Sequence, residues 1–292
     1  KYVKNYFSVV SNDNKSQIRL SDSSNRYAQD IINGFCGDQL QYFIDTTSGQ
    51  TTISGSGPMN DYWSSDSPFT INNELIRKVI INGATTIGRC AFYQCSNLES
   101  ITLSNSLQTI SESAFYSCSN LKNIEIPKSV TLIESFSFQC TGLTKIELPL
   151  GITTISIQTF SDCLSLENIT IPSSVTYIET SAFYSCKSLK TITIPDNVLL
   201  ISAAAFAFCS SLEQITLPNN LQVLSSFLFD TCSSLESIEI PTSITTVESR
   251  CFVKCSALTF IELPNNVSII ESAAFENCNN LRNITIPNQV KA

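Results

Sequence analysis

A phenylalanine recurs along most of this chain at intervals of 23 residues, with a single interval of 22. The series is Phe92, Phe115, Phe138, Phe160, Phe183, Phe206, Phe229, Phe252 and Phe275. A fixed period of this size is the signature of a solenoid, in which each unit covers the apolar face of its neighbour. One unit is too short to bury its own apolar face. The chain is therefore predicted to fold as a stack.

The residues around each phenylalanine also repeat, as Pro-x-x-Val-x-x-Ile-x-x-x-Ala-Phe-x-x-Cys-x-x-Leu-x-x-Ile-x-Ile. The Leu-x-x-Ile-x-Ile part places two apolar residues on one side of a short strand. Stacked strands lie about 4.8 Å apart, so equivalent residues should contact their own kind in the next unit. Structural positions of this type are Phe115, Cys118, Leu121, Phe183, Cys186 and Leu189. In the short interval we assign the repeated cysteine to Cys140 and place the missing residue between Phe138 and Cys140.

The Ala-Phe-x-x-Cys-x-x-Leu pattern, with Ile-Pro after the strand, resembles the BspA-type leucine-rich repeats of bacterial and protozoan surface proteins. The resemblance covers residues 76–292. Residues 34–62 are similar to the amino-terminal cap of that family, with Gly-x-Cys-Gly at the start and Ile-Ser-Gly-x-Gly-x-Met near the end. The resemblance implies an α/β-type repeat solenoid, a right-handed superhelix with a parallel sheet on its concave side and short irregular or 3₁₀ segments opposite.

Three segments follow from this pattern. Residues 1–33 form a polar amino-terminal segment, residues 34–75 a β cap, and residues 76–292 about nine repeats of 23 residues. The open first edge of a stack invites aggregation unless it is covered. Alternating apolar residues at 40–44, a glycine-containing turn and a second alternating run at 51–53 predict a β-hairpin that covers it.

Composition limits the possible partners. The chain has 292 residues and a formal net charge of −8, which disfavours nucleic acid and anionic membrane surfaces. No stretch reaches the roughly 18 to 20 uncharged apolar residues that cross a bilayer. Because the chain begins with Lys1 and stops partway through the repeated phrase, we expect a piece of a longer protein, with any signal peptide or anchor outside it.

Catalysis and metal binding find little support in the residue types. The chain has no histidine, which removes the commonest general base and most catalytic zinc sites. Of its twelve cysteines, nine belong to the repeat and are expected to be buried free thiols. The exceptions are Cys36, Cys90 and Cys251, and a bridge from Cys36 to Cys90 is one possibility. We predict no catalytic residues, no metal ligands and no cofactor.

The outward positions of the strands are the informative ones. The residue between the two apolar strand residues forms a column that contains Glu125, Glu147, Glu239 and Glu262, and a second column two residues earlier contains Phe260. One interpretation is a solvated acidic face with a stray aromatic residue. The other is a protein-binding surface on which Phe260 is an anchor and the glutamates select a basic partner.

The resemblance implies a non-enzymatic cell-surface or secreted adhesion protein whose partner is a protein of a host cell, the extracellular matrix or another microbe. Four possible N-glycosylation sites, Asn14, Asn168, Asn266 and Asn283, also favour secretion. The many thiols favour an alternative, an intracellular leucine-rich-repeat scaffold or enzyme inhibitor in a reducing compartment.

Overall fold

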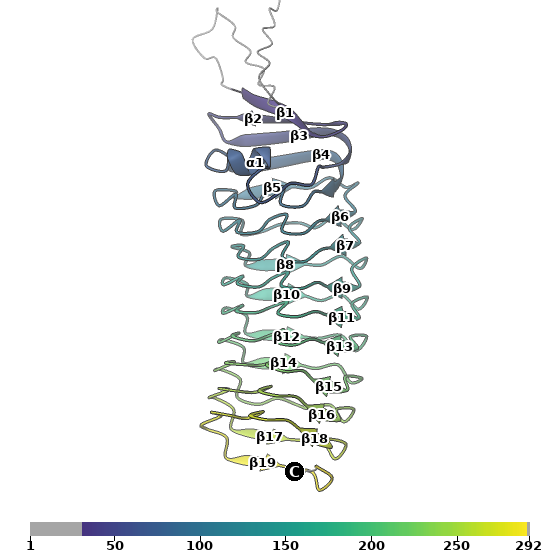
Figure 1. Cartoon of the computed structure of the whole chain (residues 1–292), viewed down its shortest axis with the longest axis vertical. Coiled ribbons are helices and arrows are strands. Elements are labelled where there is room, and N and C mark those ends of the chain that lie inside the picture. Colours follow the sequence, from purple (N-terminus) through teal and green to yellow (C-terminus); the bar gives the residue numbers. More distant parts are fainter. Residues whose placement is uncertain (1–30, 291–292) are drawn as a thin grey trace, which may run out of the picture.

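A computed structural model describes residues 31–290 and arranges them as a tall column of stacked turns (Figure 1). Most of the predicted polar segment 1–33, together with Asn14, lies outside the described residues. The predicted solenoid is confirmed, with parallel sheets along the column. Within residues 31–290 helix is limited to the four residues of α1 (Pro68–Ile71), so the repeats are built from strands and turns alone. Between Ile31 and Val290 no helix is long and apolar enough to span a bilayer.

The first end of the column is covered by β1 (Ile31–Gly37), β2 (Leu40–Asp45) and β3 (Gln50–Pro58). The hairpin predicted from residues 40–53 is confirmed, because β2 and β3 pair in antiparallel register. Strand β3 then pairs in parallel with β4 (Lys78–Ile87), which begins the stack. The cap thus converts an antiparallel hairpin into the parallel order of the repeats.

Each turn of the solenoid carries two outward faces. The long-strand face consists of β5 (Ser100–Thr102), β8 (Lys145–Glu147), β10 (Asn168–Thr170), β12 (Thr191–Thr193), β14 (Gln214–Thr216), β17 (Phe260–Glu262) and β19 (Asn283–Thr285). The short-strand face consists of β6 (Thr109–Ile110), β7 (Leu132–Ile133), β9 (Thr154–Ile155), β11 (Tyr177–Ile178), β13 (Leu200–Ile201), β15 (Val223–Leu224), β16 (Thr246–Val247) and β18 (Ile269–Ile270).

A proline turn joins the two strands of each turn of the solenoid. Proline has no N–H to extend a ladder, but its carbonyl accepts a hydrogen bond from the residue three positions later. Val175 N donates to Pro172 O at 3.0 Å, for example. Ser104, which replaces proline, accepts the same bond from Leu107 N. The long-strand face corresponds to the predicted concave side, whereas the separate sheet of the short-strand face was not predicted.

The phenylalanines form a continuous stack through the core. Phe183 has no exposed surface, and its ring centroid lies 5.5 Å from that of Phe160 and 5.2 Å from that of Phe206. The stack also includes Phe69 of α1, whose ring lies 4.7 Å from that of Phe92. The serine that caps α1, Ser67, is buried and hydrogen-bonded to Ala91 O. Phe69 lies 23 residues before Phe92 and so continues the series, but Pro68 and Asn72 stand where the repeat has alanine and cysteine, which is why the Ala-Phe-x-x-Cys pattern did not include it.

The segment around each phenylalanine is a run of turns with two residues in the left-handed region. These residues lie two positions before and two positions after the phenylalanine, as with Ser181 (φ 55°) and Ser185 (φ 60°). Backbone N–H groups of Ser181, Phe183 and Ser185 donate to carbonyls of the following turn. Because these bonds between turns satisfy the backbone, this side of the solenoid needs no helix.

The assignment of Cys140 to the repeated cysteine position is wrong; we call this position, three residues after each phenylalanine, the cysteine rung. Thr141 lies three residues after Phe138, is 3% exposed, and donates from Oγ1 to Phe138 O at 2.8 Å. Cys140 instead occupies the left-handed position (φ 58°) and is half-buried. The missing residue therefore lies between Thr141 and Leu143, since the stack keeps the backbone geometry next to Phe138 and shortens the looser turn beyond it.

Candidate functional site

The long-strand face holds all five residues predicted to bind a partner, and all are exposed. Glu147 lies on β8, and Phe260 and Glu262 lie on β17. Glu125 and Glu239 occupy the equivalent places in turns whose residues 123–125 and 237–239 do not form strands. The two columns deduced from the repeat therefore face outward as predicted.

The long-strand ladder is interrupted three times, and two of the interruptions coincide with glutamates; the third lies between β10 and β12, at the uncharged residues Thr170 and Thr193. The sequence places Glu125 beside Glu147 and Glu239 beside Glu262, and like charges directly opposite each other destabilise a ladder. In the structure neither pair is held in strand register, whereas Glu147 pairs with Thr170 and Glu262 with Thr285. The expected direct Glu–Glu strand pairs are thus absent, because the first turn of each pair leaves the ladder.

Phe260 lies in a groove of about 670 Å³ on the long-strand face. Its floor includes the buried side chains of Ile240 and Leu263. Glu239 and Glu262 line the same groove, and no lysine or arginine does. Phe260 keeps 46% of its surface exposed. The structure therefore brings together an exposed aromatic ring and two carboxylates that have no basic neighbour in the groove.

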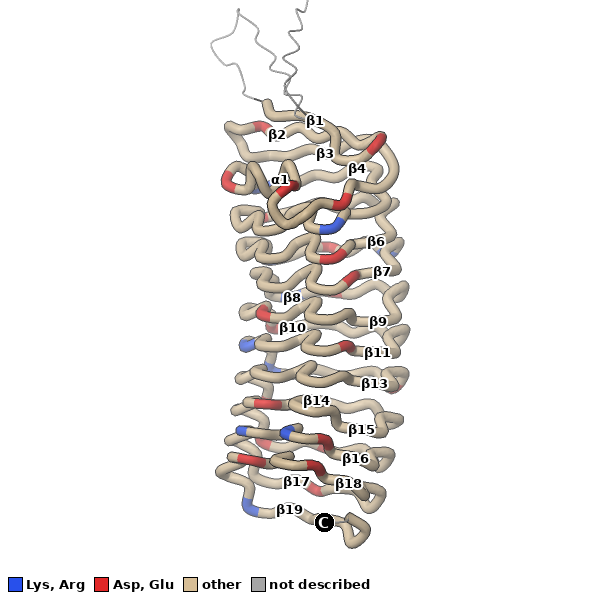
Figure 2. The backbone as a smooth tube through the Cα atoms, in the orientation of Figure 1, with Lys and Arg blue, Asp and Glu red and all other residues tan. Residues whose placement is uncertain are grey.

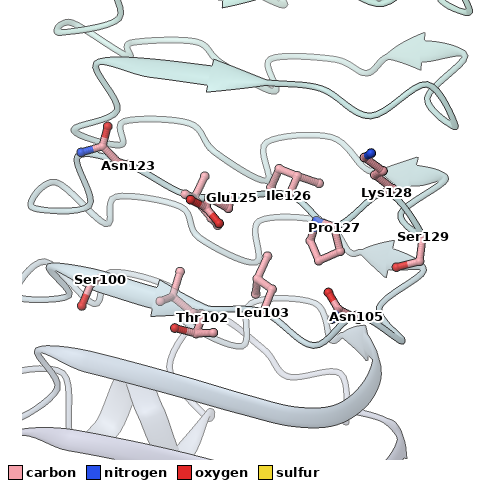
Figure 3. Close-up of a pocket in the computed structure, with 12 residues that line it drawn as sticks. Ser100, Thr102, Leu103, Asn105, Asn123, Glu125, Ile126, Pro127, Lys128 and Ser129 are labelled. Carbon is pink, nitrogen blue, oxygen red and sulfur yellow. The ribbon is translucent and has the colours of Figure 1, made fainter.

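A second groove, of about 760 Å³, lies near the cap end of the same face. Figure 3 shows Glu125 above Thr102 of the preceding turn, with Lys128 toward the proline corner. This groove differs from the Phe260 groove because it contains no aromatic side chain and includes a cation. Glu125 therefore lies in a different groove from Phe260, Glu239 and Glu262, and Glu147 lines neither groove.

The cysteine rungs are free thiols, and burial raises their pKa. Desolvation raises the pKa of Cys95, Cys163 and Cys209 to about 12. Each rung thiol also donates a hydrogen bond to the carbonyl of the phenylalanine in the preceding turn, as from Cys209 Sγ to Phe183 O at 3.1 Å. A neutral, buried thiol is a poor nucleophile and a poor metal ligand. Cys36 and Cys90 are both free, so the bridge considered from the sequence is not formed.

Thiol labelling should separate the cysteines by burial. In native protein at neutral pH, Cys140 and Cys278 should react first, because they are the two half-buried thiols. Denaturation without reduction should then release all twelve. Ellman titration of the parent and of Cys140→Ser measures this, and the variant should lose one fast thiol. Rapid native reaction of Cys186 would contradict a closed core.

Carboxylates repeat on the other side of the column for a structural reason. Glu134, Glu179, Glu248 and Glu271 follow β7, β11, β16 and β18, where Figure 2 shows acidic segments one above another. Each accepts a hydrogen bond of 2.8 to 3.0 Å from a backbone N–H of the preceding turn. These glutamates accept hydrogen bonds from backbone N–H groups that have no strand partner. The repeat did not reveal this role, because the donor lies 22 positions away in the sequence.

The possible glycosylation sites within the described residues are exposed. Asn168 and Asn283 lie on β10 and β19 of the long-strand face, and Asn283 pairs directly with Phe260. Asn266 lies at the proline corner and donates from its side chain to Thr242 O. A glycan on Asn283 would therefore stand beside the Phe260 groove.

Among residues 31–290 the structure brings together no side chains that form a metal site or a catalytic site. Across residues 31–290, no group of three or more cysteine, aspartate or glutamate side chains is placed to hold a metal ion. The exposed carboxylates of the two grooves lie beside threonine, serine and asparagine, without a paired acid and base of contrasting environment. The arrangement is suited to contact with a surface.

Comparisons with known proteins agree with this fold. The family described as BspA type leucine rich repeat region matches residues 67–190 and 176–292. A leucine-rich repeat protein from Bacteroides ovatus is similar in structure, with a TM-score of 0.60, 23% identity, and coverage of 88% of this chain and 89% of the other. A leucine rich cell surface protein from Faecalibacterium prausnitzii gives a TM-score of 0.54, 24% identity, and coverage of 88% and 89%.

The pneumococcal vaccine antigen PcpA is also similar, with a TM-score of 0.54, 21% identity, and coverage of 90% of this chain and 71% of the antigen. A sequence comparison with curated proteins finds no match. The family match extends over most of the chain and over every turn of the solenoid from Phe69 onward. The chain therefore belongs to the family of BspA-type leucine-rich-repeat proteins.

Proposed function

We propose that this chain is a non-enzymatic adhesion protein of the cell surface that binds a protein partner through its long-strand face. One structural relative is described as a cell surface protein and another as a vaccine antigen, and both descriptions support display outside the cell. The partner is a protein of a host cell, of the extracellular matrix or of another microbe.

The observation that carries the proposal is the groove around Phe260. Exposed aromatic side chains contribute much of the energy of protein interfaces because they offer large area at low entropic cost. Glu239 and Glu262 flank this ring without a basic residue in the groove, so their charge is available to a partner. Complementary charge speeds association and selects among partners.

The twelve free thiols favour a second candidate, an intracellular scaffold or enzyme inhibitor, because thiols persist in reducing compartments. Their burial weakens this argument, since a thiol at the centre of the stack is protected from oxidants in either compartment. The two candidates differ in where the full-length protein resides, which immunogold labelling of intact cells would decide.

The proposal is tested by screening the purified chain against a panel of purified extracellular-matrix proteins and then comparing variants on the partner that binds. Phe260→Ala should weaken binding by at least about 2 kcal/mol, or roughly 30-fold, mostly through faster dissociation. Glu239→Gln with Glu262→Gln should chiefly slow association and reduce its dependence on salt. Surface plasmon resonance at two salt concentrations measures both effects.

Thr193→Ala and Thr216→Ala are matched controls, since both residues are exposed on the same face and lie outside the Phe260 groove. A further pair, Glu125→Gln and Glu147→Gln, tests the separate acidic positions nearer the cap. If the Phe260 variant binds a verified partner as tightly as the parent, while short-strand-face variants do not, the long-strand face is not the binding surface.

A further inference from the structure

A third groove on the long-strand face, of about 510 Å³, adjoins the Phe260 groove. It extends from Thr193 on β12 to Thr242 at the proline corner two turns further along. Glu239, Ile240 and Thr242 line both grooves. The two grooves therefore form one depression that crosses the turns from β12 to β19, and we call it the acidic trough.

The floor of the acidic trough is apolar and its rim is polar. Phe260, with 46% of its surface exposed, is a large apolar contact on the rim, and the other rim side chains are mainly carboxylates, amides and hydroxyls. A concave site with an apolar floor and a few polar groups is typical of ligand recognition. The floor consists of buried side chains, which are Ile194, Ile215, Leu217, Ile240 and Leu263.

Three carboxylates line the trough, and no lysine or arginine does. They belong to Asp196, Glu239 and Glu262, and all three residues are exposed. Asp196 is held in place by Asn219, whose backbone N–H and side-chain amide donate to Asp196 Oδ1 at 2.9 and 3.1 Å. Like charges that gather without a cation repel one another, and a ligand that brings positive charge relieves this repulsion.

The other charged side chains on this part of the long-strand face cancel one another. Lys190, Glu213, Glu236 and Arg282 directly precede the long-strand positions of their turns, at the opposite end from the proline corners. Two of them are basic and two are acidic. The net charge of −3 on the long-strand face between β12 and β19 therefore comes from the three carboxylates of the trough.

We propose that the acidic trough binds an extended segment of the partner that is rich in lysine or arginine, with an apolar side chain of that segment against Phe260. The inference rests on the proposed function, because it takes the long-strand face as the binding surface. Four steps between turns, of about 4.8 Å each, make the trough about 19 Å long. An extended chain rises about 3.3 Å per residue, so roughly six residues fill the trough.

Fluorescence polarisation with synthetic peptides tests the proposal. A fluorescein-labelled hexapeptide of alternating lysine and leucine should bind, whereas the same peptide with glutamate in place of lysine should not. Raising NaCl from about 0.02 to about 0.5 M should weaken binding at least about tenfold, because salt screens charge pairs at an exposed rim. Among peptides of about three, six and nine residues, affinity should rise up to six and then level off, because the trough is filled.

Two triple variants with the same change of net charge locate the bound peptide. The trough variant should bind the lysine peptide at least about tenfold more weakly than the parent and lose most of the salt dependence. The control variant should stay within about twofold of the parent, because its three exposed glutamates do not line the trough. The trough variant combines Asp196→Asn, Glu239→Gln and Glu262→Gln, and the control variant combines Glu125→Gln, Glu147→Gln and Glu167→Gln. Circular dichroism confirms that both variants fold.

Single substitutions separate the aromatic contact from the hydroxyls of the rim. Phe260→Ala should weaken binding of the lysine peptide about fivefold, because the ring supplies much of the apolar contact area. Thr193→Ala and Thr216→Ala should change binding by less than about twofold, because each removes one exposed hydroxyl and no charge.

Equal weakening in the trough and control variants, or binding of the glutamate peptide, would overturn the proposal. A neutral hexasaccharide of N-acetylglucosamine that binds more tightly than the lysine peptide would also overturn it and assign the trough to glycans. If no peptide binds, while a matrix protein binds in a manner that depends on Phe260, this inference fails and the proposed function stands. If the lysine peptide binds the trough, while no protein binds the long-strand face, the proposed function fails instead.

Discussion

The folded protein should lose most of its stability between pH 8 and pH 10. Nine cysteine side chains have no exposed surface: Cys36, Cys95, Cys118, Cys163, Cys186, Cys209, Cys232, Cys251 and Cys255. Burial raises the pKa of each of these thiols, in the case of Cys36 and Cys209 to about 12. In the unfolded chain the same thiols ionise with a pKa of about 8.5.

The sign of the effect follows from proton binding. Below pH 8.5 the thiols are neutral in both states, and their contribution to stability is fully present. Above pH 8.5 the unfolded chain releases protons that the folded chain retains, so the free energy of unfolding falls as pH rises toward the folded pKa of about 12. Each buried thiol should cost about 2 kcal/mol between pH 8 and pH 10.

The loss of unfolding free energy summed over nine such thiols exceeds the 5 to 15 kcal/mol that holds a typical domain folded. Urea titrations followed by circular dichroism at pH 7, 8, 9 and 10 measure the loss. Cys186→Ala should lower the free energy of unfolding at pH 7. Its loss of unfolding free energy between pH 8 and pH 10 should be smaller than that of the parent by about 2 kcal/mol. Cys140→Ala is the control, because Cys140 is only half-buried. A free energy of unfolding that is unchanged at pH 10 would contradict the buried, neutral thiols.

Phe183→Ala should destabilise the protein by about 3 to 5 kcal/mol. The ring is fully buried and stacks on Phe160 and Phe206 at once. Its loss removes two aromatic contacts and leaves a cavity that neighbouring turns cannot fill without breaking their own register. Urea titration of parent and variant at pH 7 gives the difference.

Phe275→Ala should cost visibly less than Phe183→Ala, because Phe275 stacks only on Phe252 and is half-buried. Phe260→Ala makes the same change at an exposed position and should stay within about 0.5 kcal/mol of the parent. Equal losses at Phe183 and Phe275 would argue against a stack whose stability is the sum of contacts between neighbouring turns.

Periodicity was enough to predict the solenoid, because every turn repeats the contacts of the previous one. It identified the buried phenylalanine, cysteine, leucine and isoleucine positions, and it placed Glu262 and Phe260 on an outward face. The cap hairpin was predictable for a different reason, since the alternation at residues 40–44 and 51–53 is local. The partner-binding role of the outward residues remains a proposal that the repeat alone does not carry.

The contacts between adjacent turns of the solenoid were decided only by the tertiary structure, above all for polar residues and for residues that depart from the repeat. Thr141 took the cysteine rung and Cys140 the left-handed turn, because backbone bonds between turns fix the geometry next to Phe138. Phe69 extended the stack from α1, which has the 23-residue spacing but lacks the alanine and cysteine of the repeat. Glu134 became a backbone acceptor, and the turn of Glu125 left the ladder. A sequence period states which residues are equivalent, but hydrogen bonds between residues 22 or 23 positions apart depend on how adjacent turns lie in space.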